Sequence, residues 1–497
     1  MKMVMRKKIL YMILFAYAVF ASAIGYMAGQ GAGPTLFPLK LEIAYVIVCV
    51  VCLVIYGIRY GKVRKDSGKS LTPGIFVWIG VAVLVAGYIY SRQFWMMDEI
   101  QHLANCNSVK LQGVTIPDVA AMAGYYLEQL AGIPTGITIR FAMPALFFVL
   151  MGMVLYEAAA AMYVDDAKKS GIVFLLETVI FITCGKWIYS SGVVQYSILN
   201  AEQTACVFLP VLVFALLLNI CCTNCGRITK KDCTELFLIV LLALLLNPRV
   251  LVLYLVTGLV GAGYVIVVRY SSRIGNSAFK FMVFYCLITI LICINPWSKI
   301  NFWSAFYAKD EIWMIWQMLP VVLVTAYCIV AIPHWIRNDK KLLAAGSAVC
   351  IGVLITGMLA EPRIETESRN ADHGGWSDCE DIASEIPLDD PMTKVLAPDE
   401  VMEYLRAGSM NVGLLYEPGL IISDHAENYY DTAVLAIHAS MLEPQNKLGQ
   451  IVQIVKGNQC SYLIIPLEAD ERWEMEQGGF SVIKENDKFV LYYCPVI

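Results

Sequence analysis

The chain has 497 residues, of which 58% are hydrophobic and only 16% are charged, and its formal net charge is −4. A soluble protein carries about 25% charged residues, so this composition excludes an ordinary soluble protein and predicts an α-helical multi-pass membrane protein. Nothing in the composition suggests that the protein binds nucleic acid.

Apolar runs recur along the chain from the N-terminus to residue 360. A helix rises 1.5 Å per residue, so about 20 residues cross a hydrocarbon layer about 30 Å thick. Most of the runs approach this length, and together they predict about eleven transmembrane segments. The runs cover residues 9–28, 41–58, 72–90, 137–161, 171–188, 203–220, 236–246, 250–268, 281–296, 312–333 and 342–360.

Lysine and arginine concentrate in alternate loops between these runs. Because cytoplasmic loops carry an excess of both residues, the alternation predicts an integral plasma-membrane protein with a cytoplasmic N-terminus and an extracytoplasmic C-terminus. The cation-rich stretches lie at residues 2–8, 59–69, 168–169, 227–231, 269–280 and 337–341.

Two adjacent carboxylates and a histidine follow the third apolar run, at Asp98, Glu99 and His102. The predicted topology places them on the outer face. Residues 91–136 around them mix charged and apolar positions, as short helices at a membrane interface do. Three interpretations stay open here: a general base, a metal site that includes His102, and the acidic first turn of a helix.

A second outer loop, residues 295–311, is rich in aromatic side chains, among them Trp297, Trp303 and Tyr307. Trp and Tyr gather at the headgroup level of membranes, so the loop fits an aromatic belt. The same side chains would also form a wall for a sugar or a lipid.

The apolar run 236–246 is short, about 17 Å as a helix, and Arg249 follows it within three residues. Cation-rich stretches flank this hairpin, so Arg249 is predicted to lie below the outer membrane surface, where it needs an anionic partner. A lipid phosphate is one such partner. A structural carboxylate and snorkelling toward the headgroups are the alternatives.

Other charged residues lie in or beside the apolar runs. Arg140 and Lys186, at the outer ends of their runs, are further candidates for binding a lipid phosphate. Glu177 lies well inside its run and is expected to pair with a polar neighbour on another helix.

The composition becomes polar after Ala360. Residues 361–391 are predicted to form a linker, and residues 392–497 a soluble extracytoplasmic α/β domain in which Asp399 caps a helix. The domain has no nucleophile elbow and no Gly-rich phosphate loop, so we assign no chemistry to it alone. Its histidines His425 and His438 are expected to be surface or structural residues, not ligands. The strands are predicted at 394–397, 412–416, 462–466, 480–484 and 488–494, and the helices at 399–407, 426–441 and 446–456.

This arrangement resembles the GT-C superfamily of integral-membrane glycosyltransferases, which use polyprenyl-phosphate-linked sugars as donors. The resemblance rests on the motif Asp98-Glu99-x-x-His102 in an early outer loop, on the number of apolar runs, and on the C-terminal domain at the same face. It implies that residues 1–360 form a GT-C-like transmembrane domain and that Asp98 or Glu99 is the catalytic base. Two apolar runs precede the one that leads into the motif, which departs from the commonest pattern of the family.

The implied reaction agrees with the chemistry of the residues. A sugar attached through phosphate already has a good leaving group, so one carboxylate that takes the acceptor proton is sufficient and the anomeric carbon is inverted. Arg249, with Arg140 or Lys186, would stabilise the departing polyprenyl phosphate. His102 would orient the base or help to hold an optional Mg²⁺ or Mn²⁺, and no cofactor is required. The acceptor would be a glycan, a lipid or a protein of the cell envelope.

Two other classes of protein fit parts of the sequence. A transporter or flippase of lipid-linked or small solutes would use Glu177 and Arg249 along its pathway. A noncatalytic scaffold or a polymer ligase of the cell envelope is a third interpretation. The sequence has no internal repeat, and a soluble outer domain is unusual for a transporter, so the glycosyltransferase is preferred.

Overall fold

The computed structural model describes residues 2–66, 72–92, 97–163, 166–189, 201–223, 228–270, 278–294, 303–305, 318, 321–338, 376–421 and 426–495. The chain divides into two compact units. The helical unit comprises residues 1–22, 43–93 and 143–364, and the mixed unit comprises residues 23–42, 94–142 and 365–497.

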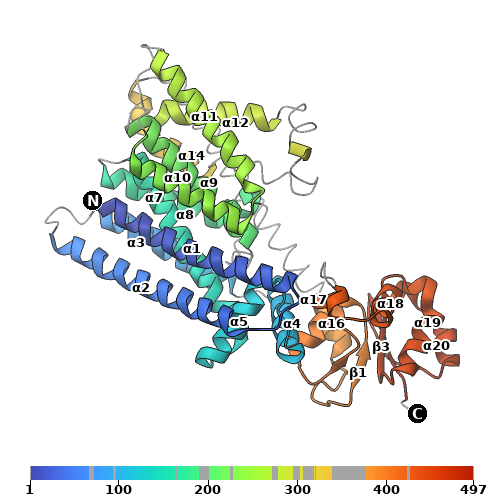
Figure 1. Ribbon diagram of the computed structural model, residues 1–497. Helices are drawn as coiled ribbons and strands as arrows, with labels where there is room; N and C mark the ends of the chain where they lie inside the picture. Colours follow the sequence, from blue (N-terminus) through green and yellow to red (C-terminus); the bar gives the residue numbers. More distant parts are fainter. Residues whose placement is uncertain are drawn as a thin grey trace. The chain divides into compact units, whose positions relative to one another are not determined.

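Helices form almost all of the described part of the helical unit (Figure 1). They overlap every predicted apolar run from 9–28 to 312–333, whereas the run 342–360 lies outside the described residues. The helices, two of which extend into the mixed unit, are α1 (Lys2–Gly29), α2 (Leu36–Asp66), α3 (Thr72–Ser91), α7 (Met143–Met162), α8 (Ala167–Tyr189), α9 (Ala201–Leu218), η3 (Asn219–Thr223), α10 (Lys230–Leu246), α11 (Val250–Tyr270), α12 (Ala278–Ile294), η4 (Trp303–Ala305) and α14 (Val321–Asn338).

Several of these helices have the length and composition of membrane spans. Among the described residues, four stretches are long and apolar enough to cross a membrane: Lys7–Gly29, Gly74–Ser91, Thr135–Met162 and Val250–Val267. They indicate a membrane protein. The predicted count of about eleven segments and the orientation of the termini stay predictions.

Helix α10 is longer than its apolar run. It begins at Lys230, and the Thr229 side chain accepts a hydrogen bond from the Asp232 backbone while the Asp232 carboxylate accepts one from the Thr229 backbone. This capping box starts the helix in a polar turn, so α10 has 17 residues instead of the predicted 11. The residues added at its start are polar or charged, so the apolar part of α10 is still 236–246, and the expectation that this apolar run is too short to span stays a prediction.

Helices α3 and α8 pack closely because α3 presents glycines to its neighbour. A β-carbon on Gly80 would lie 2.7 Å from a ring carbon of Phe174, and one on Gly87 would lie 2.4 Å from the Ile182 side chain. Small residues at such positions let two membrane helices approach each other, so bulkier residues at either glycine would push α3 and α8 apart.

A buried ion pair joins α1 to α10 in the helical unit. Lys7 Nζ lies 3.2 Å from Glu235 Oε2, and the two side chains are only 6% and 9% exposed. At a second point along the same helices the Ser22 hydroxyl donates to the Leu245 carbonyl at 2.9 Å. The two helices are therefore tied near both ends of α10.

The mixed unit combines a group of short helices with a five-stranded sheet. The sheet has the order β2-β1-β3-β5-β4, with β1 parallel to β2 and β3, and with β5 antiparallel to β3 and β4. The helices before the sheet are α4 (Met97–Gln112), α5 (Val119–Ala131), α6 (Thr135–Ile137) and the π-helical turn η1 (Thr138–Ala142). The strands are β1 (Lys394–Leu396), β2 (Gly413–Leu414), β3 (Tyr462–Pro466), β4 (Ser481–Glu485) and β5 (Phe489–Tyr493).

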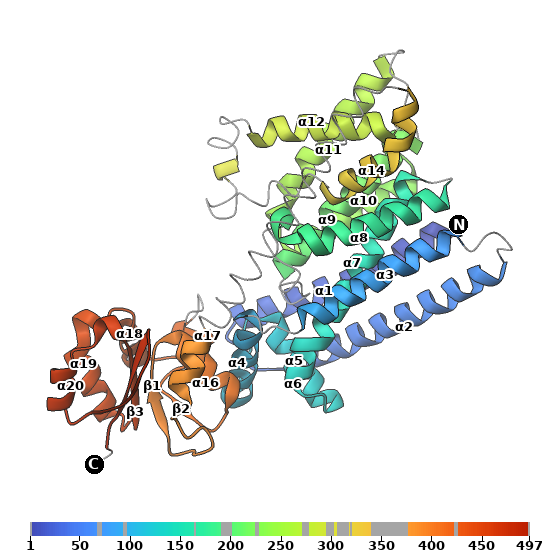
Figure 2. The same ribbon diagram turned by 180° about the vertical axis from the view of Figure 1, so that it is seen from behind.

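The C-terminal part of the mixed unit is the predicted α/β sandwich. Helix α16 (Asp399–Gly408) lies on one side of the sheet, and α19 (Pro444–Gly457) and α20 (Arg472–Gln477) lie on the other (Figure 2). Helix α18 (Thr432–Met441) precedes α19, and the turn α17 (Pro418–Ile421) follows β2. The core also includes buried side chains of a helix at residues 376–383, within the stretch predicted to be a linker.

Asp399 does not cap α16 as predicted. It is the first residue of the helix, Pro398 occupies the cap position, and the Asp399 carboxylate lies 3.0 Å from His438 Nε2. His438 thereby ties α18 to α16, in the structural role expected of it.

A buried charge pair connects the sandwich to α4. The Arg406 guanidinium donates three hydrogen bonds of 2.8–3.1 Å to the Glu417 carboxylate, and the two side chains are 3% and 4% exposed. Ser108 of α4 donates to the same carboxylate at 2.8 Å, and Asn107 donates to the Arg406 carbonyl at 2.9 Å. The charge of Arg406 is thus compensated by that of Glu417, and both residues are also hydrogen-bonded to α4.

Removing one partner of this pair is expected to destabilise the protein strongly. Glu417→Gln leaves the buried Arg406 guanidinium without a counter-charge, and such a loss costs about 3–5 kcal/mol. We expect a clear fall in the midpoint of thermal unfolding of the purified full-length protein.

The exposed pair between Arg472 and Glu485 in the same sandwich is the matched control. Solvent screens it, so Glu485→Gln is expected to change the midpoint little. Equal losses in the two variants would contradict the stabilising role of the buried pair.

Candidate functional site

The predicted acidic motif forms the first turn of α4, which begins at Met97. Asp98 is the second residue of the helix, and its side chain lies outside the described part of the chain. The Glu99 side chain is fully buried. His102 follows Glu99 by three residues, so the two side chains are neighbours on the helix surface.

His102 forms the centre of a hydrogen-bonded group. Its Nδ1 donates to Asp118 Oδ2 at 2.6 Å, and the Asn105 amide donates to the same oxygen at 2.9 Å. The His102 side chain is 17% exposed and that of Asp118 is 9% exposed. The hydrogen bond from Nδ1 to Asp118 fixes the orientation of the ring.

Asp118 is held by α5 as well as by α4. Its Oδ1 accepts hydrogen bonds of 3.0 Å from the backbone of Ala120 and Ala121, which makes it the N-cap of α5. Burial by itself would raise the pKa of the Asp118 carboxyl, but the charge and hydrogen bond of His102, with the bonds from Ala121 and Asn105, hold that pKa below its usual range. Asp118 is therefore an anion beside the imidazole.

A second polar group fixes the segment that carries Arg140. The Glu128 carboxylate accepts from Lys110 at 2.8 Å and from the backbone and hydroxyl of Thr135. It thereby holds α6 and the π-helical turn η1 against α4 and α5. Arg140 is in η1 and is half-buried, and such π-helical turns occur often at functional sites.

The other predicted site residues do not all belong to this group. Arg249 belongs to the helical unit and is exposed after the C-terminus of α10. Trp303, also in the helical unit, is fully buried in η4. The Lys186 side chain and the residues Trp297 and Tyr307 lie outside the described part of the chain.

Two further observations concern ions. Within the residues that the structure describes, no group of three or more His, Cys, Asp and Glu side chains is arranged to hold a metal ion. Glu177 is fully buried in α8, and neither of its carboxylate oxygens has a hydrogen-bond partner among the described residues. The prediction that Glu177 pairs with a polar neighbour on another helix is therefore wrong as far as the described residues are concerned.

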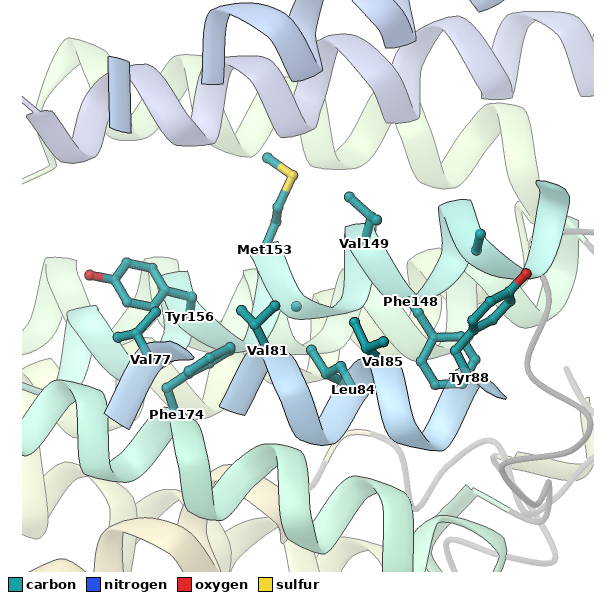
Figure 3. Close-up of a pocket in the computed structure, with 12 residues that line it drawn as sticks. Val77, Val81, Leu84, Val85, Tyr88, Phe148, Val149, Met153, Tyr156 and Phe174 are labelled. Carbon is teal, nitrogen blue, oxygen red and sulfur yellow. The ribbon is translucent and has the colours of Figure 1, made fainter. Parts of the chain in front are cut away.

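An apolar cavity of about 300 Å³ lies in the helical unit between α3, α7 and α8 (Figure 3). Its wall consists of aliphatic and aromatic side chains, with the hydroxyls of Tyr88 and Tyr156 toward its opposite ends. A cavity of this size and lining suits a hydrocarbon chain better than a polar solute.

Sequence reasoning missed Asp118 and Asn105, the two residues that orient His102. Asp118 precedes the apolar stretch that begins at Val119, and an aspartate in that position is a typical helix N-cap. This signal predicts the start of α5 but gives no indication of the contact with His102.

Comparisons of the chain with protein-family models, with curated proteins and with solved structures give no match. Function is therefore inferred from the residues of this chain alone.

Acidification is expected to weaken the contact between α4 and α5. Because the folded-state pKa of Asp118 lies below its unfolded value, its stabilising effect is present above the unfolded pKa and is lost as the pH falls through the folded value. The stability of Asp118→Asn should therefore depend less steeply on pH than that of the parent protein between about pH 5 and pH 2.

Thermal unfolding of both proteins across this pH series measures the effect. Asp487→Asn, at an exposed position, is the control and should retain the parent slope. An unchanged slope in Asp118→Asn would contradict the ionic state assigned to Asp118.

Proposed function

We propose that this protein is a membrane glycosyltransferase that transfers a sugar from a polyprenyl-phosphate donor to a glycan, lipid or protein acceptor of the cell envelope. The observation that carries the proposal is the centre on α4, where the buried Glu99 neighbours His102 and His102 bonds to Asp118. A carboxylate beside an oriented imidazole is an arrangement that accepts a proton from a hydroxyl group.

In the proposed reaction the acceptor hydroxyl attacks the anomeric carbon of the donor sugar. Its oxygen forms the new glycosidic bond, the bond from the anomeric carbon to the phosphate oxygen breaks, and its electron pair leaves with the polyprenyl phosphate. The hydroxyl proton passes to the base, which we assign to Asp98 or Glu99, with His102 as the orienting group. One displacement inverts the anomeric carbon, and a divalent cation is optional.

Cations would stabilise the departing phosphate. Arg140 is the best supported of them, because its π-helical turn packs against α4 and α5 in the same unit as Glu99. Arg249 and Lys186 are proposed for the same role. The aromatic residues Trp297, Trp303 and Tyr307 are proposed to border the sugar or lipid.

The proposed topology has a cytoplasmic N-terminus and an extracytoplasmic C-terminal domain. It is supported by the pair of Lys7 and Glu235, because Glu235 follows the cation-rich stretch 227–231 in the sequence. Two segments that the charge pattern assigns to the cytoplasmic side thus lie next to each other.

Turnover by the purified protein tests the proposed function. We expect release of polyprenyl phosphate from at least one donor in a panel of polyprenyl-phosphate sugars. Loss of a catalytic base typically costs about 10²–10⁴-fold in rate, so we expect Asp98→Asn or Glu99→Gln to lower the rate by that factor.

The matched control is Glu476→Gln, which removes an exposed carboxylate on α20 and should leave the rate unchanged. Full activity in both single variants and in the double variant would exclude the proposed base.

The transporter is retained as a second candidate because of Glu177. A buried carboxyl group without a hydrogen-bond partner among the described residues is typical of an ion or substrate pathway in a membrane. If no donor releases its lipid phosphate, and if proteoliposomes move a solute in a manner that Glu177→Gln abolishes, the protein is a transporter.

A further inference from the structure

The turn α17 of the C-terminal sandwich packs directly on α4. A β-carbon added to Gly419 in this turn would lie 1.8 Å from Oδ1 of Asn105 and 2.8 Å from its Cγ. Heavy atoms in favourable contact lie about 3.5–4.0 Å apart, so any larger residue at position 419 displaces the Asn105 side chain.

Asn105 is one of the groups that position the imidazole. Its amide donates to Asp118 Oδ2 at 2.9 Å, and the same oxygen accepts the hydrogen bond from His102. A shift of the amide therefore changes the position of the carboxylate, and with it the orientation of the ring.

The turn α17 is itself fixed on α4. Glu417, two residues before Gly419, is bound by Arg406 and by Ser108, and its backbone N–H donates to the Tyr430 hydroxyl at 2.8 Å. The turn cannot move away from Asn105 without disturbing this buried pair.

We propose that Gly419 and Asn105 are positioning residues, and that the C-terminal sandwich sets the orientation of His102 through α17. The order of contacts runs from Gly419 to Asn105, then to Asp118, then to His102. The importance of that orientation for turnover rests on the proposed function, whereas the contacts themselves do not depend on it.

A double-mutant cycle in the full-length protein tests this order, with Gly419→Ala, Asn105→Ala and the double variant. The first measurement is the rate at which diethyl pyrocarbonate modifies His102, followed by peptide mass spectrometry across a pH series. The second is the release of lipid phosphate. We expect Gly419→Ala to shift the pH profile of His102 modification and to lower kcat about tenfold or more with little change in KM, since small misplacements have large effects on rate.

In the Asn105→Ala background the methyl group that Gly419→Ala adds has no amide to displace. We therefore expect the double variant to match Asn105→Ala in both measurements. Additive effects of the two changes, or an unchanged His102 profile in Gly419→Ala, would overturn the proposal. Gly449→Ala is the matched control, because a β-carbon there meets nothing within 4 Å and the residue is exposed on α19.

Two further outcomes are separable. If Gly419→Ala does not fold, Asn105→Ala alone decides, and an unchanged His102 profile in that variant contradicts the positioning role. If the parent protein releases no lipid phosphate from any donor, the proposed function fails, while the modification of His102 still tests the order of contacts.

Discussion

The packing of the mixed unit depends on the polar side chains of α4, each of which needs a hydrogen-bond partner on another element. His102, Asn105 and Ser108 follow one another on α4 at intervals of three residues, and each interval turns about 300° around the helix axis. Consecutive side chains in this row therefore lie close together on the helix surface. His102 and Ser108, at the two ends of the row, face different directions. This difference in direction lets one helix bind Asp118 of the α5 cap on one part of its surface and Glu417 of the sandwich on another. Because an unpaired buried polar group costs about 1–3 kcal/mol, the loss of either partner would destabilise the folded unit.

Much of the fold follows from local sequence patterns. The strand predicted at 462–466 is β3 with the same bounds, and the predicted helix at 399–407 is α16 with one additional residue. These patterns succeed because the period of apolar residues reports which face is buried. They underestimate helices that begin in a polar turn, as α10 does at its capping box, because a count of apolar residues does not include the cap.

The candidate site is only partly predictable from sequence. The charge pattern indicates the turn with Glu99 and His102, but the partner of His102 is 16 residues away and that of Ser108 is 309 residues away. Neither contact has a periodic signal, since each depends on how separate elements pack. The contact of Gly419 with Asn105 is equally hidden in the sequence. The residues around Gly419 suggest only a turn, and the close approach to Asn105 arises when that turn packs on α4.

The two oxygens of Asp118 join the folding of this region to its proposed chemistry. One oxygen caps α5 and the other holds His102 and Asn105, so the imidazole takes its orientation only when α4 and α5 are both formed. A group held in this way needs no reorganisation when charge develops during a reaction, which is the condition under which electrostatic stabilisation is most effective. The same reasoning gives the C-terminal sandwich a role although it carries no catalytic motif of its own. By fixing α17 on α4 through the buried pair of Arg406 and Glu417, it supplies rigid support to a helix of 16 residues.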